Sequence, residues 1–407
     1  MKNAAGSEER LTFRYSQRML EMPFPSAVGH AGDAISFAEG DAYPPDMADM
    51  TASAVEALTT RRSETLQYAP RAGLPDLRRW VTDYLAKENV RVTPENVLIV
   101  NGAKHGLDLA CKLFLNPGDA VIVTAPTYMT ALPILRSYGP RFIQVRQDSE
   151  GLLVDEVEAE LRACERNGGP FPKIIYNVFE FHNPTGVTTS EPRRARLLDL
   201  AERYNVMIVE DDPYRRIRFE GEPVPPVQAL DRANRVIGLG TFAKIIAPGL
   251  RVGWVTAAPE IVRKMAVVKS DGGTCPLTQR MIVEYCRAGQ LEPHIKTLVK
   301  TYEMHRDVML EMLAKYLPEA TTMRPSGGYY LWIQMPEDID TDHLLPLAQR
   351  HGVRYLPGSR FYAAGGPRNY LRLAYSFSSV EEIQEGMRRL AAAVSKSRKA
   401  EGPGGGH

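Results

Sequence analysis

The 407-residue sequence lacks several features that would place it in common classes of protein. No hydrophobic run approaches the roughly 18 residues that a membrane span needs, and the N-terminus has no apolar segment typical of a secretory signal. The four cysteines show no C-x-x-C spacing, and the eight histidines form no metal-binding pattern. Fifty basic and forty-nine acidic residues leave a net charge of +1, which argues against binding to nucleic acid or to a membrane surface. We therefore expect a reduced, cytoplasmic protein of enzyme size without a metal site.

The middle of the chain alternates apolar runs with amphipathic helix patterns. Buried strands are predicted at 97–100, 120–123, 174–179, 206–209, 236–239 and 252–255. Strands separated by helices predict a mainly parallel sheet that is covered by helices on both faces. Beyond about residue 290 the pattern changes to a long amphipathic helix, two short strands and a final helix, predicted at 292–317, 329–334, 371–374 and 380–394. This part predicts a smaller α+β domain.

These patterns predict how the chain divides into domains. Residues 1–45 are expected to join the smaller domain, residues 46–288 to form the large domain, and residues 289–395 to complete the smaller one. The tail after about Ser395 is polar and rich in glycine, so residues 396–407 are expected to be disordered, as are the first dozen residues.

Four polar clusters directly follow predicted strands, where ligands collect in open α/β sheets. In chain order they are Asn101-Gly102-Ala103-Lys104-His105, Asn183-Pro184-Thr185-Gly186, Glu210-Asp211-Asp212-Pro213-Tyr214 and Gly240-Thr241-Phe242-Ala243-Lys244, with Arg251 shortly after the last. Taken singly, each cluster is also compatible with an ordinary turn, a helix cap or a solvated surface charge.

Taken together, the clusters supply what one cofactor, pyridoxal phosphate, requires. Free N–H groups at the start of a helix after Gly102 suit a phosphate. Asp211 is a carboxylate at a buried strand end, which is costly unless a cation such as a protonated ring nitrogen pairs with it. Lys244 lies in an apolar segment, where burial lowers the pKa of the amine and allows it to form a Schiff base.

The chain resembles the class I and II aminotransferases of fold type I. Within that family it is similar to the branch of 2-aminoadipate and kynurenine aminotransferases, to which the enzyme-like domains of some bacterial regulators also belong. The resemblance covers about residues 37–394 and rests on the segments LQYAPRAGLPDLR, NGAKHGLDLA, DAVIVTAPTY, HNPTG, VEDDPY, GTFAKIIAPGLRVGW, RPSGGYYLW and YLRLAYSF. It implies a mainly parallel central sheet flanked by helices, a smaller α+β domain built from the N- and C-terminal segments, and pyridoxal phosphate as cofactor.

The resemblance implies three catalytic residues. Lys244 is expected to bind the cofactor covalently and then to shuttle a proton at the substrate. Asp211 is expected to keep the ring nitrogen protonated by pairing with it. Tyr214, together with Asn183, is expected to donate hydrogen bonds to the phenolic oxygen, while Tyr128 stacks on the ring.

The resemblance also implies how the cofactor and the substrate are bound. The phosphate is expected to contact Gly102, Ala103, Lys104, Thr241 and Arg251. Tyr68 is expected to reach the cofactor phosphate of the other subunit, which implies a homodimer with shared active sites. Arg372 is expected to bind the α-carboxylate of an amino acid substrate through two parallel hydrogen bonds.

Two departures from the usual family pattern concern the phosphate. Ala243 stands where a serine usually helps to bind it, and the loss of one charge-assisted hydrogen bond costs roughly 1.5–3 kcal/mol. Lys104 and His105 replace two amide side chains. A cation there either compensates for the missing hydroxyl or meets a second anionic group on the substrate.

Other departures concern the substrate and the cofactor ring. The segment 37–41 resembles a loop that covers the substrate, so Glu39 and Gly40 are expected to contact it. Glu39 replaces a glycine, and its carboxylate predicts repulsion of dicarboxylates and a preference for cationic or polar substrates, unless it points into solvent. Phe179 and His182 replace a proline and a glutamine, and we expect His182 to be packed rather than catalytic.

These observations predict an aminotransferase that moves an amino group between an L-amino acid and a 2-oxo acid. The departures leave an alternative open, in which the same cofactor-stabilised carbanion serves elimination, replacement, carbon–carbon bond formation or oxidation in specialised metabolism. A third interpretation is the ligand-sensing domain of a transcription regulator. We do not expect it, because the 36 residues before Phe37 leave no room for a winged helix.

Overall fold

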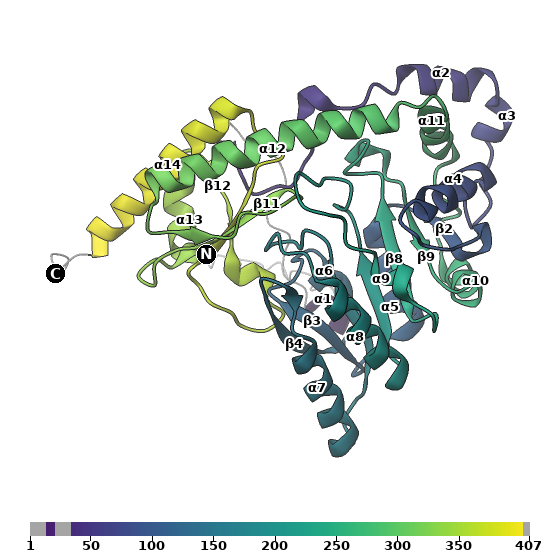
Figure 1. The fold of residues 1–407 in the computed structure, drawn as a ribbon, viewed down its shortest axis with the longest axis horizontal. Coiled ribbons are helices and arrows are strands. Elements are labelled where there is room, and N and C mark those ends of the chain that lie inside the picture. The colour runs from purple at the N-terminus through teal and green to yellow at the C-terminus, as the bar shows by residue number, and fades with distance from the viewer. Residues whose placement is uncertain (1–13, 21–33, 402–407) are drawn as a thin grey trace, which may run out of the picture.

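The computed structural model describes residues 14–20 and 34–401, which form a larger and a smaller lobe (Figure 1). The larger lobe holds an eight-stranded sheet with the order β2–β9–β8–β7–β6–β3–β4–β5. Its strands are β2 (Val97–Val100), β3 (Ala120–Ala125), β4 (Arg141–Asp148), β5 (Gly151–Leu152), β6 (Pro172–Asn177), β7 (Met207–Asp211), β8 (Val236–Thr241) and β9 (Gly253–Thr256). Strands β4, β3, β6, β7 and β8 pair in parallel, while β9 runs antiparallel to both β2 and β8. The carboxyl ends of β2, β3, β6, β7 and β8 therefore meet at one edge.

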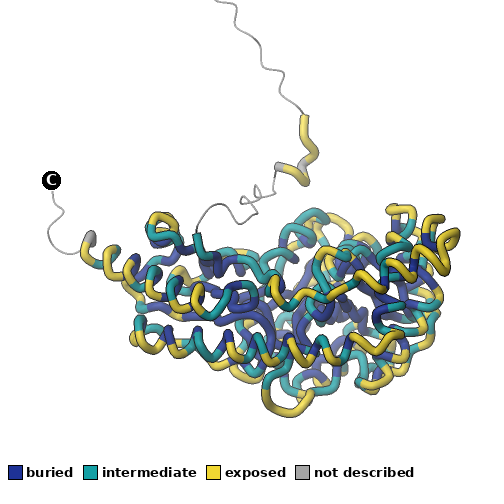
Figure 2. The backbone as a smooth tube through the Cα atoms, turned by 90° about the horizontal axis from the view of Figure 1, so that it is seen from above, coloured by how far each residue is buried: buried dark blue, intermediate teal, exposed yellow. Residues whose placement is uncertain are grey.

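Helices cover both faces of the large sheet, so its central strands are mainly apolar, whereas β4 near one edge also carries exposed polar residues. Successive side chains of a strand point to opposite faces, and in β2 Leu98 and Val100 pack into one layer while Val97 and Ile99 pack into the other. The first layer contains α5 (Ala103–Phe114), α6 (Ala131–Arg136) and α10 (Pro259–Val268). The second contains α4 (Pro75–Ala86), α7 (Val154–Asn167), α8 (Glu191–Arg203) and α9 (Val227–Leu230). Figure 2 shows the resulting buried interior beneath helices whose outer turns are exposed.

The smaller lobe is built around an antiparallel sheet with the order β10–β11–β14–β13. Its elements are β10 (Thr321–Thr322), β11 (Tyr330–Gln334), α13 (Thr341–Arg350), β12 (Val353–Arg354), β13 (Leu356–Pro357), η4 (Gly358–Phe361), β14 (Tyr370–Ala374) and α14 (Val380–Glu401). The long helix α12 (Leu291–Tyr316) crosses from the larger lobe to the smaller one (Figure 1). Strand β1 (Ile35–Ser36) pairs in parallel with β12, so the N-terminal segment joins the smaller lobe.

The remaining elements lie mostly at the surface of the larger lobe. They are α1 (Gln17–Leu20), η1 (Pro44–Asp46), α2 (Thr51–Thr59), α3 (Arg62–Thr65), η2 (Pro94–Asn96), η3 (Pro248–Leu250) and α11 (Pro276–Arg287). No helix among the described residues is both long and apolar enough to cross a lipid bilayer.

The predicted strands and the predicted long helix correspond to observed elements within a few residues. The mainly parallel sheet is confirmed, and β9 is one of its antiparallel strands because it returns from β8 without a crossover helix. One expectation is corrected. The tail is helical as far as Glu401, because Arg398 forms ion pairs with Glu319 at 2.6 Å and with Asp338 at 2.8 Å. The first dozen residues and residues 402–407 lie outside the described part of the chain, and the domain boundaries stay predictions.

Candidate active site

A cavity of about 550 Å³ opens at the carboxyl edge of the large sheet and is closed on its other side by the smaller lobe. Parallel strands end at this edge, so the loops after them reach the same cavity. The predicted site residues that line it are Glu39, Gly40, Gly102, Ala103, Lys104, Tyr128, Asn183, Asp211, Tyr214, Thr241, Lys244, Arg251 and Arg372. Tyr68 is the predicted residue that lies elsewhere, and 86% of its surface is exposed.

Lys244 extends into the cavity from the loop after β8. Its Nζ donates a hydrogen bond to the carbonyl oxygen of Gly40 at 2.7 Å and lies 5.1 Å from the ring centre of Tyr329. Burial lowers the pKa of Lys244. Tyr330 and Asp41 act in the opposite direction, and the cations of Arg372 and Lys104 lower the pKa further, so the net shift is downwards. A lowered pKa favours the neutral amine, which is the nucleophile that a Schiff base requires.

Asp211 is the last residue of β7 and is buried. The hydroxyl of Tyr176, on the neighbouring strand β6, donates to its Oδ2 at 2.7 Å, whereas its Oδ1 has no hydrogen-bond partner among the described residues. Burial raises the pKa of Asp211 to about 6, although the Tyr176 hydroxyl and the Lys104 cation act in the opposite direction. A buried carboxylate with one unsatisfied oxygen beside a cavity fits a protonated ring nitrogen.

A chain of contacts joins Arg372 directly to Asn183 and, through Tyr330, to Tyr214. Arg372 donates from Nη1 to Asn183 Oδ1 at 2.9 Å and from Nη2 to the carbonyl oxygen of Ala38. Its guanidinium lies 4.0 Å from the ring centre of Tyr330, whose hydroxyl lies 3.1 Å from that of Tyr214. Within the described chain, Asn183 Nδ2 and Arg372 Nε have no acceptor. These buried donors fit a phenolic oxygen and a substrate carboxylate.

The loop between β2 and α5 has the properties of a phosphate site. Helix α5 begins at Ala103, and the first amides of a helix have no carbonyl partner within it. Gly102 has a φ of +84°, and a Cβ at this position would lie 3.0 Å from Nη2 of Arg251. Thr241 ends β8 beside this loop, and burial lowers the pKa of Lys104. The cations of Lys104 and Arg251 give this part of the cavity positive charge that a phosphate would neutralise.

Of the two residues that replace amides in this loop, only Lys104 lines the cavity. His105 instead accepts a hydrogen bond at Nδ1 from the backbone N–H of Asn101 at 3.2 Å and lies 3.8 Å from Asp271. His105 therefore stabilises the loop through its backbone and lies outside the cavity in which a substrate would bind.

His182 and Phe179 are both buried outside the cavity wall. The Nε2 of His182 lies 3.1 Å from Thr124 Oγ1, and its Nδ1 lies 2.9 Å from Thr185 Oγ1. Burial lowers the pKa of His182 to about 3, so the ring is neutral at physiological pH. Phe179 packs in the core between the sheet and α8. His182 is thus a packed residue in this structure.

Glu39 lines the cavity, but it is not the unpaired carboxylate that our prediction assumed. The Ser36 hydroxyl donates to its Oε2, and Arg354 Nη2 lies 3.7 Å from its Oε1. This pairing offsets the negative charge, so the predicted repulsion of dicarboxylates loses its physical basis.

The sequence analysis missed Tyr176 and Tyr330. Tyr176 lies within an apolar strand and is therefore expected to be buried. Because a buried tyrosine hydroxyl needs a hydrogen-bond partner, the tyrosine itself is the signal that could have suggested a contact with Asp211. Tyr330 lies within the segment RPSGGYYLW. It contacts the covering loop so closely that a Cβ at Gly40 would lie 1.9 Å from its hydroxyl, which explains the glycine there.

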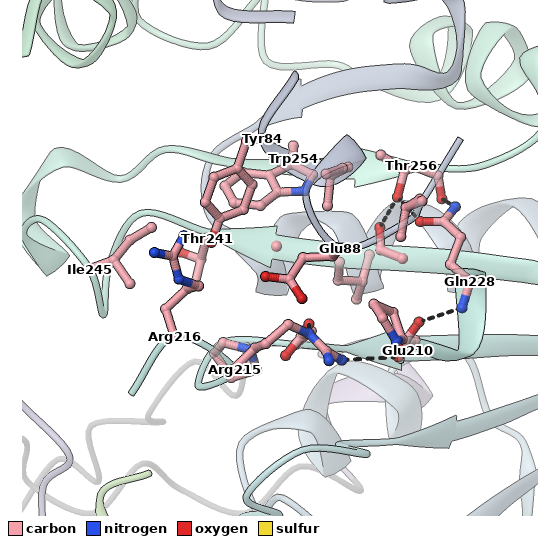
Figure 3. A pocket seen from close by; sticks show the side chains of 18 residues that line it. Tyr84, Glu88, Glu210, Arg215, Arg216, Gln228, Thr241, Ile245, Trp254 and Thr256 are labelled. Carbon is pink, nitrogen blue, oxygen red and sulfur yellow. Dashed lines mark hydrogen bonds and ion pairs between the residues drawn. The ribbon is translucent and has the colours of Figure 1, made fainter. Parts of the chain in front are cut away.

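A second, narrower cavity of about 40 Å³ lies beside β7 and β8 (Figure 3). Three of its charged residues are paired with one another or with the backbone: Arg215 binds Asp212 at 2.5 Å, and Glu210 accepts two N–H groups at the start of α9. The described residues contain no group of three His, Cys, Asp or Glu side chains suited to a metal ion. This cavity has room for water only, and its ion pairs hold the loop that follows Asp211.

Comparison with known proteins agrees with this geometry. The model of the family described as aminotransferase class I and II matches residues 33–390. The aromatic-amino-acid aminotransferase 1 of Thermococcus litoralis is 38% identical over 84% of this chain and 83% of its own. A kynurenine aminotransferase of Pyrococcus horikoshii in complex with PMP is 36% identical, with a TM-score of 0.88 over 94% of this chain and 97% of that one.

A third relative shows the same similarity. The alpha-aminoadipate aminotransferase of Thermus thermophilus, complexed with N-(5'-phosphopyridoxyl)-L-leucine, is 33% identical, with a TM-score of 0.84 over 90% of this chain and 94% of that one. These names favour amino-group transfer over the elimination, bond-forming and oxidase alternatives. Together with a cavity whose unsatisfied groups fit the cofactor, they show that the chain belongs to the class I and II aminotransferases and is a pyridoxal-phosphate-dependent transferase of fold type I.

Proposed function

We propose that Lys244 and Asp211 are the two residues that make this chain an aminotransferase, acting within a homodimer. The proposal rests on one observation, which is that the amine of Lys244 and the half-satisfied carboxylate of Asp211 line the same cavity. When bound, the cofactor supplies an electron-accepting ring that stabilises negative charge at the substrate Cα. Lys244 Nζ would take the proton from Cα and pass it to C4′, the cofactor carbon that carries the amino nitrogen, so that the amino group stays on the cofactor.

The other cavity residues orient the reactants. Asp211 keeps the ring nitrogen protonated, because a buried carboxylate is stabilised by an adjacent cation. Asn183 and Tyr214 donate hydrogen bonds to the phenolic oxygen, and Tyr128 covers one face of the ring. Arg372 is held in place by Asn183 and Ala38 and binds the substrate α-carboxylate.

The experiment that tests this proposal follows the cofactor spectrum of the purified protein, which should be yellow. A panel of amino acids that includes acidic, aromatic, basic and sulfonium members is added with and without pyruvate or 2-oxoglutarate. We expect one equivalent of 2-oxo acid and of aminated cofactor without an acceptor, and continuous turnover with one. Turnover without any acceptor, with release of ammonia, would contradict amino-group transfer.

Lys104 is proposed to replace the hydroxyl that Ala243 lacks. We expect Lys104→Gln to weaken binding of pyridoxamine phosphate about 10-fold, because one charge-assisted contact to the phosphate is lost. Ala243→Ser in the Lys104→Gln background should restore most of this affinity, and Lys112→Gln, at an exposed lysine of the same helix α5, is the matched control. Equilibrium dialysis at two salt concentrations measures the effect. Unchanged affinity in Lys104→Gln would refute this role.

The homodimer is supported by the surface of α2 and the segment after it. Val55, Leu58 and Leu66 are 56%, 38% and 61% exposed and lie in the same part of the chain as Tyr68. Grouped apolar side chains on a surface are typical of a protein interface. A partner covering them would bring its cofactor to Tyr68, as the shared active site requires.

We expect Leu66→Glu to raise the dissociation constant of the dimer by about 100-fold or more, because an unpaired carboxylate is costly to bury. Met323→Glu, at a similarly exposed apolar residue of the smaller lobe, is the control and should remain a dimer. Analytical ultracentrifugation distinguishes the two. A Leu66→Glu protein that stays fully dimeric at nanomolar concentration would rule out this interface.

The cytoplasm is the proposed location, with a role in amino acid metabolism and biosynthesis. All four cysteines are free, and Cys111 and Cys164 are buried as thiols. Free thiols agree with a reducing compartment.

A further inference from the structure

Part of the wall that the smaller lobe contributes to the cavity lies away from the residues that are proposed to hold the cofactor. Its residues come from the covering loop, α13, β12, β13 and η4, and they include Glu39, Leu345, Gln349, Arg354, Leu356 and Arg360. The phosphate loop, Asp211 and Lys244 belong to the opposite wall, at the edge of the large sheet. The part of a substrate that extends beyond Cα therefore faces the smaller lobe.

Arg360 is a half-buried cation without a partner within the described part of the chain. Other buried and half-buried arginines of that part form hydrogen bonds or ion pairs, as Arg215 does with Asp212 at 2.5 Å and Arg354 with Glu39 at 3.7 Å. Removing a guanidinium from water is costly unless an acidic group replaces the lost hydration. Arg360 is thus positioned to gain from an acidic group that enters the cavity.

The turn that contains Arg360 is fixed beside the substrate site. The next residue, Phe361, accepts a hydrogen bond at its carbonyl oxygen from the N–H of Thr127 at 2.7 Å, directly before Tyr128. The ring centre of Phe361 lies 5.1 Å from the guanidinium of Arg372. A substrate held by its α-carboxylate at Arg372 therefore lies next to this turn.

The charges of the wall favour an anion. Glu39 and Arg354 offset each other, and Asp41, which also lines the cavity, is not free, so Arg360 is the cation of this wall that no carboxylate of the described residues neutralises. We infer that Arg360 determines specificity by binding a carboxylate at the far end of the substrate side chain. One half-reaction then uses a dicarboxylic amino acid and the corresponding 2-oxo acid. This inference rests on the proposed function and adds a substrate class to it.

The test measures single half-reactions of the holoenzyme with glutamate and with alanine by the absorbance of the cofactor. We expect Arg360→Gln to lower kcat/KM for glutamate about 10- to 100-fold and to change that for alanine less than about threefold, because only glutamate loses a charged contact. Arg360→Lys should retain part of the preference. Arg350→Gln, which removes an exposed arginine from α13, is the matched control and should change neither value.

A second pair of variants tests the charge balance of the same wall. Arg354→Gln exposes the carboxylate of Glu39 to the substrate and should also reduce the preference for glutamate, while Glu39→Gln added to it should restore that preference. Binding of glutarate, which cannot react, should weaken in Arg360→Gln, whereas binding of butyrate should not.

The outcomes separate this inference from the proposed function. Equal losses for glutamate and alanine in Arg360→Gln would show a structural role and overturn the inference. A wild-type protein that converts neutral or aromatic amino acids but none of glutamate, aspartate and 2-aminoadipate would also overturn it, while the proposed function would stand. A wild-type protein that converts no amino acid would contradict both.

Discussion

Replacing Lys244 with alanine is expected to abolish amino-group transfer and leave the fold intact. Lys244 Nζ is the amine that the covering loop holds through Gly40, and burial has lowered its pKa towards the neutral form. The loss of one positioned acid–base group slows a reaction by about 10²- to 10⁴-fold, and the loss of covalent attachment of the cofactor adds to this. We therefore expect a colourless protein that still binds pyridoxamine phosphate through its phosphate loop.

The measurement is a single-turnover reaction of pyridoxamine-phosphate-loaded protein with a 2-oxo acid. Lys173→Ala is the control, because Lys173 is exposed at the start of β6 and does not line the cavity. A Lys244→Ala protein that retains more than about one-tenth of the wild-type rate would show that another group moves the proton.

Replacing Asp211 with asparagine is expected to have opposite effects on activity and on stability. On the proposed function, the carboxylate stabilises a protonated ring nitrogen in the holoenzyme, and loss of such electrostatic stabilisation lowers kcat by about 10²- to 10³-fold. In the cofactor-free protein the same ionised carboxylate lowers the free energy of unfolding, because burial disfavours its charged form and raises its pKa from 3.8 to about 6.

The raised pKa fixes the pH dependence of this effect. A carboxyl whose pKa is higher in the folded state binds its proton more tightly there, so its contribution to stability falls as pH rises. The loss is absent below about pH 3.8, grows between the two pKa values and is complete above about pH 6. At pH 8 the cofactor-free Asp211→Asn protein should be more stable than the wild type by about 1–3 kcal/mol.

Urea unfolding of the cofactor-free proteins at pH 5 and pH 8 measures this difference. Asp148 provides a control of opposite sign, because its hydrogen bond with Arg193 lowers its pKa, so Asp148→Asn should destabilise the protein slightly. If Asp211→Asn were less stable than the wild type at pH 8, the claim that the ionised Asp211 carboxylate destabilises the cofactor-free protein would be wrong.

The cofactor side of the site could be predicted from the sequence, because its chemistry is local. Lys104, Asp211 and Lys244 each follow an apolar run within a few residues, and parallel strands bring such ends to one edge. Their roles require that these strands run parallel, which the helices between successive strands already indicate. The order of the strands, in which β2 lies beside β9 and not beside β3, is not indicated in this way.

The substrate side could not be predicted in the same way, because it depends on long-range pairing. The charge of Glu39 is offset only because β1 pairs with β12, a register that places Ser36 opposite Arg354. No local pattern specifies that pairing, and so Glu39 was expected to be free while Arg360 was not noticed. Similarly, the polar tail is helical because Arg398 meets Glu319 and Asp338.

The central claim is that Lys244 is the residue that binds the cofactor covalently, and peptide mapping after reduction tests it most directly. The cavity offers a second amine, Lys104, so the experiment has two distinguishable answers. Holoenzyme is reduced with borohydride and digested, and the modified peptide is sequenced by mass spectrometry. The account predicts one phosphopyridoxyl group, on Lys244. A label on Lys104, or on no lysine of the cavity, would contradict it.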